Sequence, residues 1–345
     1  MNERREVALS ELTTLRLGGP ARRVLTATSA EDIIDAVREV DAAGERLLIL
    51  GGGSNLVAPD DGFPGTVVCV ASRGIAVQSH DACSGATVTV AAGEPWEDLV
   101  RHAVEAGWVG TEALAGIPGL TGATPIQNVG AYGQDVSQTV ARVRTWDRQS
   151  EAVRTFAGAD CGFSYRHSRF KGSARWVVLD VTFQLALGSL AAPVRYGELA
   201  GRLGVAVGER APLAEVRAAV LELRAGKGMV LDGADHDTWS AGSFFTNPVL
   251  TSELARRLPA AAPRFPDAQG RVKTSAAWLI EQAGFTKGYG SGPARLSTKH
   301  TLALTNRGGA RIADLLALAR EVRAGVRDRF GVELVNEPVL LDTTL

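Results

Sequence analysis

The chain has 345 residues, of which 45% are hydrophobic and 22% charged, and this composition and length predict a folded protein of two or three domains. A formal net charge of −1 gives no general attraction for nucleic acid or an anionic membrane. The three cysteines are odd in number and far apart, which argues against a disulfide framework or a zinc site. No apolar signal core opens the chain and no run is long enough to span a bilayer, so we expect a cytoplasmic protein without a bound metal.

A β-α-β unit is the first element that the sequence predicts, over residues 23–55. Ser29 is placed to cap a helix that begins near Glu31, and LLIL (47–50) reads as a buried strand. GGGSN follows that strand directly, and glycines in this place commonly bring backbone N–H groups to a phosphate. The segment has neither the GK[ST] of a P-loop nor a GxGxxG followed by a helix, so a tight turn at the strand end remains the alternative.

Short strands over 66–93 and an amphipathic helix over 95–107 lead to a glycine-rich stretch, Gly116–Gly133, that carries no charged side chain. Glycine lacks the Cβ that blocks close approach and permits positive φ. The stretch therefore favours backbone that approaches a large object, with a structural loop packed between two elements as the alternative.

The next segments predict a sheet and a helix. A hairpin-like pair is expected over 140–147 and 151–156, and an exposed or ligand-facing loop over 163–171. Strict alternation over 176–187 predicts a strand in a sheet with one covered face. A helix is expected over 212–228, with Arg224 and Lys227 on one side of it because they lie three residues apart.

A linker over 229–242 and a smaller α/β unit are expected after that helix. The predicted elements of this unit are helices over 251–258, 275–284 and 310–330, a strand near 301–305 and a closing strand over 332–341.

Two polar residues in the last third of the chain are candidates for a catalytic role. Ser243 lies in GSFFTNP, which is not a GxSxG elbow, and the five histidines offer no evident triad; taken alone, a structural serine is the simpler interpretation. Glu337 lies within the apolar closing strand, where a functional carboxylate and an edge charge facing water are both open.

The order of the motifs carries more information than any one of them. They are TTLRLGG (13–19), LGGGSNLV (50–57), IPGLTGATPIQNVGAYG (117–133), YRHSRFK (165–171), YGEL (196–199), AGSFFTNP (241–248) and NEP (336–338). Over nearly the whole chain, this series resembles the UDP-N-acetylenolpyruvoylglucosamine reductase (UDP-N-acetylmuramate dehydrogenase) family. Its longer subgroup, in which a tyrosine loop closes over the substrate, matches best.

The resemblance implies an α+β architecture: a two-subdomain FAD-binding fold of the vanillyl-alcohol-oxidase type plus a smaller α/β substrate-binding domain. The implied FAD subdomains are 1–70 and 71–228, the second completed by a C-terminal strand at 331–345, and the implied substrate-binding domain is 229–330. FAD would be bound non-covalently and NADPH would be the co-substrate. We expect a monomer that takes UDP-N-acetylglucosamine enolpyruvate and NADPH and binds no nucleic acid or membrane.

The same resemblance assigns roles to residues of this chain. The implied FAD-binding residues are Gly51, Gly52, Gly53, Ser54, Asn55, Leu56, Pro118, Gly119, Gly122, Ala123, Thr124, Ile126, Gly130, Tyr132 and Arg166. The implied substrate-binding residues are Tyr196, Arg224, Lys227, Ser243 and Asn247. Thr246 departs from the family, since many relatives carry a lysine at this position, and another basic group would have to compensate if that lysine binds phosphate.

Ser243, Glu337 and Arg166 are the implied catalytic residues. Hydride would pass from flavin N5 to the vinyl C3 of the substrate, and Ser243 would give a proton to C2 as general acid. Glu337, protonated or through a bridging water, and a cation, Arg166 or Lys227, would stabilise the negative charge that develops. The product, UDP-N-acetylmuramate, is a precursor of peptidoglycan.

Three rival interpretations remain open on the sequence. An alcohol or lactone oxidase of the same fold would often attach FAD through a histidine, and neither of the two glycine-rich loops contains one. A nucleotide-binding regulatory protein without catalysis, or a structural protein with coincidental glycine loops, would oxidise no NADPH.

Overall fold

The computed structural model describes residues 1–266 and 270–345, which form two compact units. The first unit comprises Met1–Glu6, Ala21–Gly52 and Pro64–Gly226, and the second comprises Val7–Pro20, Gly53–Phe63 and Lys227–Leu345. Each unit is therefore assembled from segments that are far apart in the sequence. The division into three domains that the sequence suggested stays a prediction.

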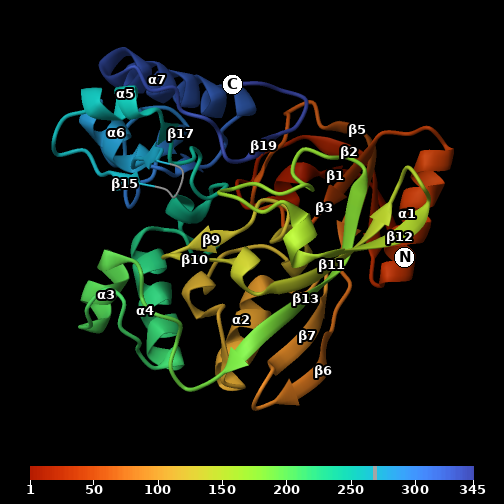
Figure 1. Ribbon diagram of the computed structural model, residues 1–345. Coiled ribbons are helices and arrows are strands. Elements are labelled where there is room, and N and C mark those ends of the chain that lie inside the picture. The colour runs from red at the N-terminus through yellow and green to blue at the C-terminus, as the bar shows by residue number, and fades with distance from the viewer. Residues whose placement is uncertain (267–269) are drawn as a thin grey trace. The chain divides into compact units, whose positions relative to one another are not determined.

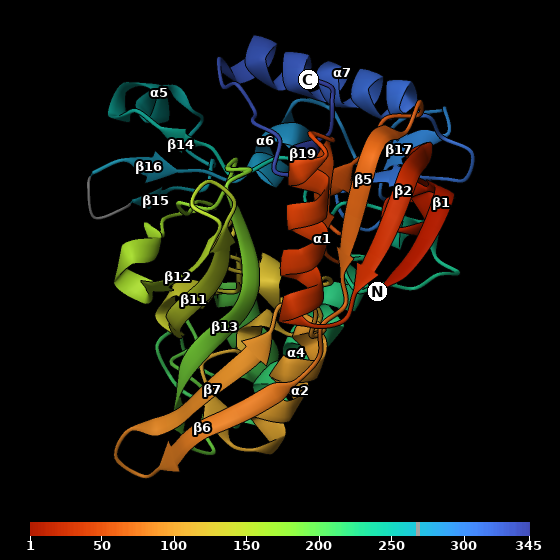
Figure 2. The same cartoon turned by 90° about the vertical axis from the view of Figure 1, so that its right-hand side faces the viewer.

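The first unit begins with a four-stranded sheet in the order β1-β2-β5-β3, of which Figure 2 shows β1, β2 and β5 side by side. Its elements are β1 (Asn2–Ala8), β2 (Pro20–Ala27), α1 (Ala30–Ala42), β3 (Leu47–Leu50) and β5 (Phe63–Val70). The predicted β-α-β unit is confirmed, and the Ser29 hydroxyl caps α1 by accepting from the Asp32 N–H at 3.0 Å. Because β5 pairs in parallel with β3 and lies between it and β2, the helix crosses over a third strand.

The first unit also contains a six-stranded sheet, in which β12, β11, β13, β7 and β6 follow one another in this order (Figure 2). In the same sheet, β8 pairs with β13. The strands are β6 (Ile75–Asp81), β7 (Gly85–Ala91), β8 (Trp108–Val109), β11 (Val140–Asp147), β12 (Ala152–Ala157) and β13 (Trp176–Leu187). The predicted hairpin is confirmed as the antiparallel pair β11 and β12.

The long strand β13 departs from the expectation of one covered face. A register shift against β11 falls between its residues Val178 and Asp180, and an extra residue in one strand reverses the faces of those that follow. Val177 and Leu179 pack with α1, whereas Val178 and Val181 pack in the other core of this unit. Both faces are therefore covered, because the bulge distributes neighbouring side chains between two cores.

Three helices and a short hairpin complete the first unit: α2 (Trp96–Glu105), β9 (Gly130–Ala131), β10 (Gln134–Asp135), α3 (Gly197–Leu203) and α4 (Leu213–Gly226). The helix predicted over 95–107 is confirmed by α2. The inference that Arg224 and Lys227 share a helical face is wrong, because α4 ends at Gly226 and Gly228 adopts a left-handed φ of 66°. Lys227 belongs to the second unit.

In its described residues, the second unit is built of helices and several short strands (Figure 1), and its buried apolar side chains pack in one core. Its elements are β4 (Leu56–Val57), β14 (Val249–Leu250), α5 (Ser252–Arg257), β15 (Phe265–Pro266), β16 (Val272–Lys273), α6 (Ala276–Gln282), β17 (Ala294–Leu296), β18 (Leu304–Asn306), α7 (Ile312–Phe330) and β19 (Val339–Leu340). The three helices agree with the sequence prediction, and the buried stripe of α7 includes Leu315, Ala319 and Val322. In the described ranges, none of the helices has the length and apolar character that crossing a bilayer requires.

Two predictions for the second unit are wrong. The segment 229–242 is no linker, because Asp237 is buried and accepts from Arg307 at 2.7 Å and from the Thr298 N–H at 2.9 Å. The strand expected over 332–341 is reduced to β19, which pairs in parallel with β4. Pro338, just before β19, has no N–H to contribute to a ladder.

Candidate active site

Within the first unit, the start of GGGSN (Gly51 and Gly52) lies directly against the glycine-rich stretch 116–133. A Cβ added to Gly52 would lie 2.9 Å from the Gly119 Cα, and one added to Gly122 would lie 2.5 Å from the Ala92 Cβ. Real Cβ atoms do not approach this closely, so glycine is required at both positions for backbone packing. Loop packing, the structural alternative, thus accounts for part of the glycine content.

The segment GGGSN also contains backbone N–H groups that packing does not explain. Within the described chain, the N–H groups of Gly52 and Gly53 donate to no acceptor, although Gly53 is buried. Buried N–H groups are normally satisfied, and adjacent N–H groups in a turn form a good anion site. The loop therefore fits the pyrophosphate of a dinucleotide cofactor.

Arg166 is held against the glycine-rich stretch by side chains that the sequence interpretation left without a role. The Ser168 hydroxyl donates to the Ile126 carbonyl at 2.6 Å. Asn128, at a left-handed φ of 50°, donates to the Ser164 carbonyl at 3.1 Å and accepts from the Ser137 N–H at 3.0 Å. Asparagine tolerates this backbone conformation better than most residues, and its place among glycines was the available signal.

Four predicted residues of the first unit form a group that we call the cation cluster: Tyr132, Arg166, Tyr196 and Arg224. The rings of Tyr132 and Tyr196 meet edge to face with centroids 5.4 Å apart. Burial, assisted by the positive charge of Arg166, lowers the pKa of Arg224 to about 10. Burial also raises the pKa of Tyr132 to about 12. At neutral pH the cluster therefore carries two cations and two neutral phenols, which suits an anionic ligand.

Ser243 is a half-buried residue beside two buried aromatic anchors, Phe244 and Phe245, each 1% exposed. Gly242 before it adopts a left-handed φ of 71° although a Cβ there would meet no atom within 4 Å, so conformation and not space requires glycine. The Gly242 N–H donates to the Ser240 hydroxyl at 3.2 Å, and the Phe244 N–H donates to the Leu302 carbonyl at 2.8 Å. Backbone bonds on both sides thus fix Ser243.

Glu337 lies beside the Ser243 segment, as the functional interpretation requires. Its N–H donates to the Phe244 carbonyl at 2.9 Å, and its carbonyl accepts from the Asn55 side chain at 3.4 Å. The second unit therefore brings together the end of GGGSN, the residue after Ser243 and Glu337. Glu337 is a half-buried residue that does not lie in a strand, so the alternative of an edge-strand charge is wrong.

Other predicted residues have structural partners. The Asn247 side-chain oxygen accepts from the Ala276 N–H at 2.9 Å at the start of α6, and the Thr246 hydroxyl and N–H both donate to the Val335 carbonyl, at 3.4 and 3.0 Å. The predicted residues of the first unit are Gly51, Gly52, Pro118, Gly119, Gly122, Ala123, Thr124, Ile126, Gly130, Tyr132, Arg166, Tyr196 and Arg224, and those of the second are Gly53, Ser54, Asn55, Leu56, Lys227, Ser243, Asn247 and Glu337.

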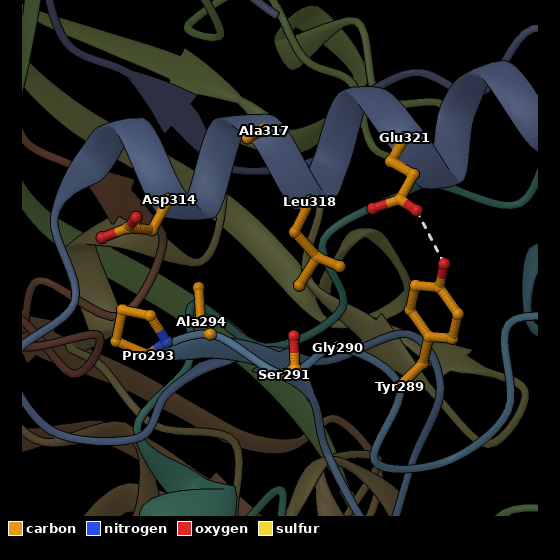
Figure 3. A pocket seen from close by; sticks show the side chains of 10 residues that line it. Tyr289, Gly290, Ser291, Pro293, Ala294, Asp314, Ala317, Leu318 and Glu321 are labelled. Atoms are coloured by element: carbon orange, nitrogen blue, oxygen red, sulfur yellow. Dashed lines mark hydrogen bonds between the residues drawn. The ribbon is translucent and has the colours of Figure 1, made fainter.

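A groove of about 510 Å³ in the second unit contains none of these residues. It opens between the loop 289–294 and α7, where the Tyr289 hydroxyl donates to Glu321 at 2.6 Å (Figure 3). Its walls carry two carboxylates, Asp314 and Glu321, and no cation, so it does not suit an anionic nucleotide. The volume of this groove is therefore no guide to where the predicted active-site residues lie.

The sequence of this chain matches known protein families. Residues 21–155 match the family described as FAD binding domain, and together with the glycine loops this match defines a flavoprotein. The expected cofactor, FAD, and the expected class of FAD-binding fold are thereby confirmed.

Residues 234–341 match the family described as UDP-N-acetylenolpyruvoylglucosamine reductase, C-terminal domain. The chain is 59% identical to the reductase of that name from Streptomyces coelicolor, covering 100% of this chain and 92% of the relative. It is 57% identical to the one from Thermobifida fusca, covering 99% and 98%. The crystal structure of the Thermus caldophilus reductase superposes with a TM-score of 0.65 at 26% identity, over 98% of this chain and 99% of the other. The chain belongs to the UDP-N-acetylenolpyruvoylglucosamine reductase family.

Proposed function

We propose that this chain reduces UDP-N-acetylglucosamine enolpyruvate to UDP-N-acetylmuramate, with NADPH as reductant and FAD as cofactor, in the synthesis of peptidoglycan precursors. The observation that carries this function is 59% identity to a named reductase over the full length of the chain. The rivals among oxidases and regulatory proteins do not explain a C-terminal match over residues 234–341.

The glycine loops are the residues proposed to hold the cofactor. The free N–H groups of Gly52 and Gly53 would bind its pyrophosphate, and the stretch from Pro118 to Tyr132 would provide backbone that approaches its ring. Bound FAD supplies the hydride that the enolpyruvyl group receives at C3.

Ser243 is proposed to donate a proton to C2 of the substrate. A hydroxyl is a weak acid, but the carbanion-like C2 is a strong base, so the proton transfer is favourable in that direction. This role needs no histidine, because the serine gives up a proton and does not attack. It does need a fixed position, and the backbone bonds of Gly242 and Phe244 are consistent with that need.

Glu337 and a cation, Arg166 or Lys227, are proposed to stabilise the charge that develops at C2 and on the adjacent carboxylate. Glu337 can do so only when it is protonated or acts through a water, since a bare carboxylate would repel the enolate. Tyr196, Arg224, Lys227 and Asn247 are proposed to bind the UDP-sugar.

Several finer assignments stay predictions. They are the monomeric state, the cytoplasmic location, the tyrosine-loop subgroup and the way in which the protein compensates for Thr246.

The function is tested with the purified protein. It should be yellow, release its flavin on denaturation, and oxidise NADPH only when UDP-N-acetylglucosamine enolpyruvate is present. Flavin that stays attached after denaturation would favour the oxidase interpretation. A protein that binds nucleotide but never oxidises NADPH would contradict the proposed enzyme.

The Ser243→Ala variant tests the proton donor. It should retain FAD and be reduced by NADPH at the normal rate, but its reduced flavin should be reoxidised by substrate on the order of 10²–10⁴-fold more slowly. Rapid mixing separates the two half-reactions. Ser291→Ala, which changes an exposed serine of the same unit, is the matched control, and normal turnover in Ser243→Ala would rule out the role.

A further inference from the structure

The motif TTLRLGG (13–19) has no assigned role, although it is one of the segments that identify the family. In the structure its second threonine joins two other motifs. The Thr14 N–H donates to the Gly53 carbonyl at 3.2 Å, and the Thr14 hydroxyl donates to the Ser240 carbonyl at 2.6 Å. One residue thus connects GGGSN with the segment that leads to Ser243.

Neighbouring contacts hold the turn that contains Thr14 against the segment that contains Ser240. The Asn306 side chain donates to the carbonyls of Leu15 and Arg16 at 3.2 and 3.1 Å, and its backbone N–H donates to the Trp239 carbonyl at 3.0 Å. The Arg16 guanidinium lies 3.9 Å from the centroid of the Trp239 ring. The turn at 13–16 and the segment at 239–240 are therefore fixed to each other by polar and cation–π contacts as well as by Thr14.

The Thr14 contacts close a circuit of bonded segments that we call the Ser243 ring. It runs from Gly53 through Thr14 to Ser240, along the chain past Ser243 to Phe244, across to Glu337, and back through Asn55. All of its members belong to the second unit. Three of its segments carry proposed roles in holding FAD, donating a proton and stabilising charge; Thr14 is the remaining link.

We propose that Thr14 is a positioning residue for proton transfer, which keeps the Ser243 segment in register with the cofactor loop. The inference rests on the proposed role of Ser243. Because threonine is β-branched, its χ1 is stiff and its hydroxyl is held toward the Ser240 carbonyl. The orientation of the peptide after Ser240 sets the direction in which the chain continues through Gly242 to Ser243. A displacement of roughly 1 Å in a reacting group can cost about 10²-fold in rate.

Thr14→Val tests this proposal, since it removes the hydroxyl while keeping the shape and the N–H bond to Gly53. We expect normal FAD content and normal reduction by NADPH. Reoxidation by substrate should slow by about 10-fold, the equivalent of one hydrogen bond, and its solvent deuterium isotope effect should increase as proton transfer becomes rate-limiting. Thr14→Ser, which restores the hydroxyl, should recover most of the rate.

The neighbouring threonine provides a matched control. The Thr13 hydroxyl donates to the Leu17 carbonyl at 3.2 Å, inside its own turn, so Thr13→Val should alter melting temperature without changing the isotope effect. If Thr14→Val does not fold, Thr14→Ala removes the same hydroxyl without adding a methyl group.

Two outcomes would overturn the inference. One is wild-type reoxidation in Thr14→Val; the other is an equal loss in both half-reactions that Thr14→Ser does not reverse, which is the pattern of a residue needed only for stability. Slow reoxidation in Ser243→Ala together with wild-type behaviour in Thr14→Val would reject Thr14 alone, whereas normal reoxidation in Ser243→Ala would reject the proposed function of the serine itself.

Discussion

The Ser243 ring and the cation cluster bring polar groups together by different physical means. In the ring, Ser243 and Glu337 are placed through backbone bonds, and their own side chains are not needed to close it. In the cation cluster, the side chains of Arg224 and Tyr132 form the structure, and burial shifts the pKa of both groups. Functional side chains of the ring should therefore be removable without loss of the fold, whereas removal of an arginine from the cluster changes its charge directly.

This difference suggests a division of labour. A proton donor must be held within a fraction of an ångström, and a hydrogen-bonded backbone provides that rigidity. Binding of an anionic group depends more on the presence of a poorly solvated cation than on its exact position. We accordingly expect variants of Ser243 and Glu337 in the ring to change the rate of chemistry, and variants of Arg224 and Tyr196 in the cluster to change substrate affinity.

The largest effect is expected when a side chain is added at Gly53, because it would displace the backbone of the Ser243 ring. A Cβ there would lie 2.0 Å from the Leu12 carbonyl oxygen at a φ of 61°, so Gly53→Ala should cost about 1–3 kcal/mol from overpacking alone. We expect the variant to purify with little flavin, measured by the absorbance ratio of flavin to protein. Gly44→Ala is the control, because its φ is 64° but no atom lies within 4 Å of the added Cβ; full flavin content in Gly53→Ala would contradict the account.

A smaller effect is expected when only a functional side chain of the ring changes. Glu337→Gln keeps the backbone bonds to Phe244 and Asn55, so folding and FAD content should be normal. Reoxidation by substrate should slow by about 10²-fold, as for loss of one transition-state contact. Glu333→Gln, on the exposed part of the same segment, should be silent, and a defect confined to flavin reduction in Glu337→Gln would reject the role.

The smallest effect is expected in the cation cluster. Arg224→Met should raise the KM for the UDP-sugar by about 10-fold, the value of a charged hydrogen bond, and leave kcat nearly unchanged. The pKa of Arg224 is about 10, so its charge is present below that pH and lost above it. Substrate affinity of the wild type should therefore fall as the pH rises through about 10, and that fall should be absent in Arg224→Met.

Arg202→Met is the control for this variant, because Arg202 is an exposed arginine on α3 that pairs with Glu222. An unchanged KM for the UDP-sugar in Arg224→Met would contradict the proposed role of the cation cluster in substrate binding.

Local patterns in the sequence predicted the regular elements well. The Ser29 cap, the helix α7 and the hairpin of β11 and β12 depend on neighbouring residues, and each was confirmed. The errors occurred where distant contacts decide. The bulge near Leu179 depends on pairing with β11, and Asp237 orders a presumed linker through Arg307 and Thr298.

The candidate site was predictable only as a set of motifs in order. The motif at 13–19 indicated the family, but nothing local in it shows that Thr14 bonds to Ser240, 226 positions away. Likewise, Asn128 and Ser168 hold the Arg166 loop through carbonyls of other segments. Side-chain bonds to distant backbone leave no periodic pattern in a sequence, so only the structure reveals them.

The division between chemistry and binding is tested most directly by mixing fully reduced enzyme with increasing concentrations of UDP-N-acetylglucosamine enolpyruvate and following flavin reoxidation. At saturating substrate, Ser243→Ala should remain slow by on the order of 10²–10⁴-fold, whereas Arg224→Met should reach nearly the wild-type rate with a raised half-saturation concentration. A normal saturating rate in Ser243→Ala, or a saturating rate in Arg224→Met that falls as far as that of the serine variant, would contradict the account.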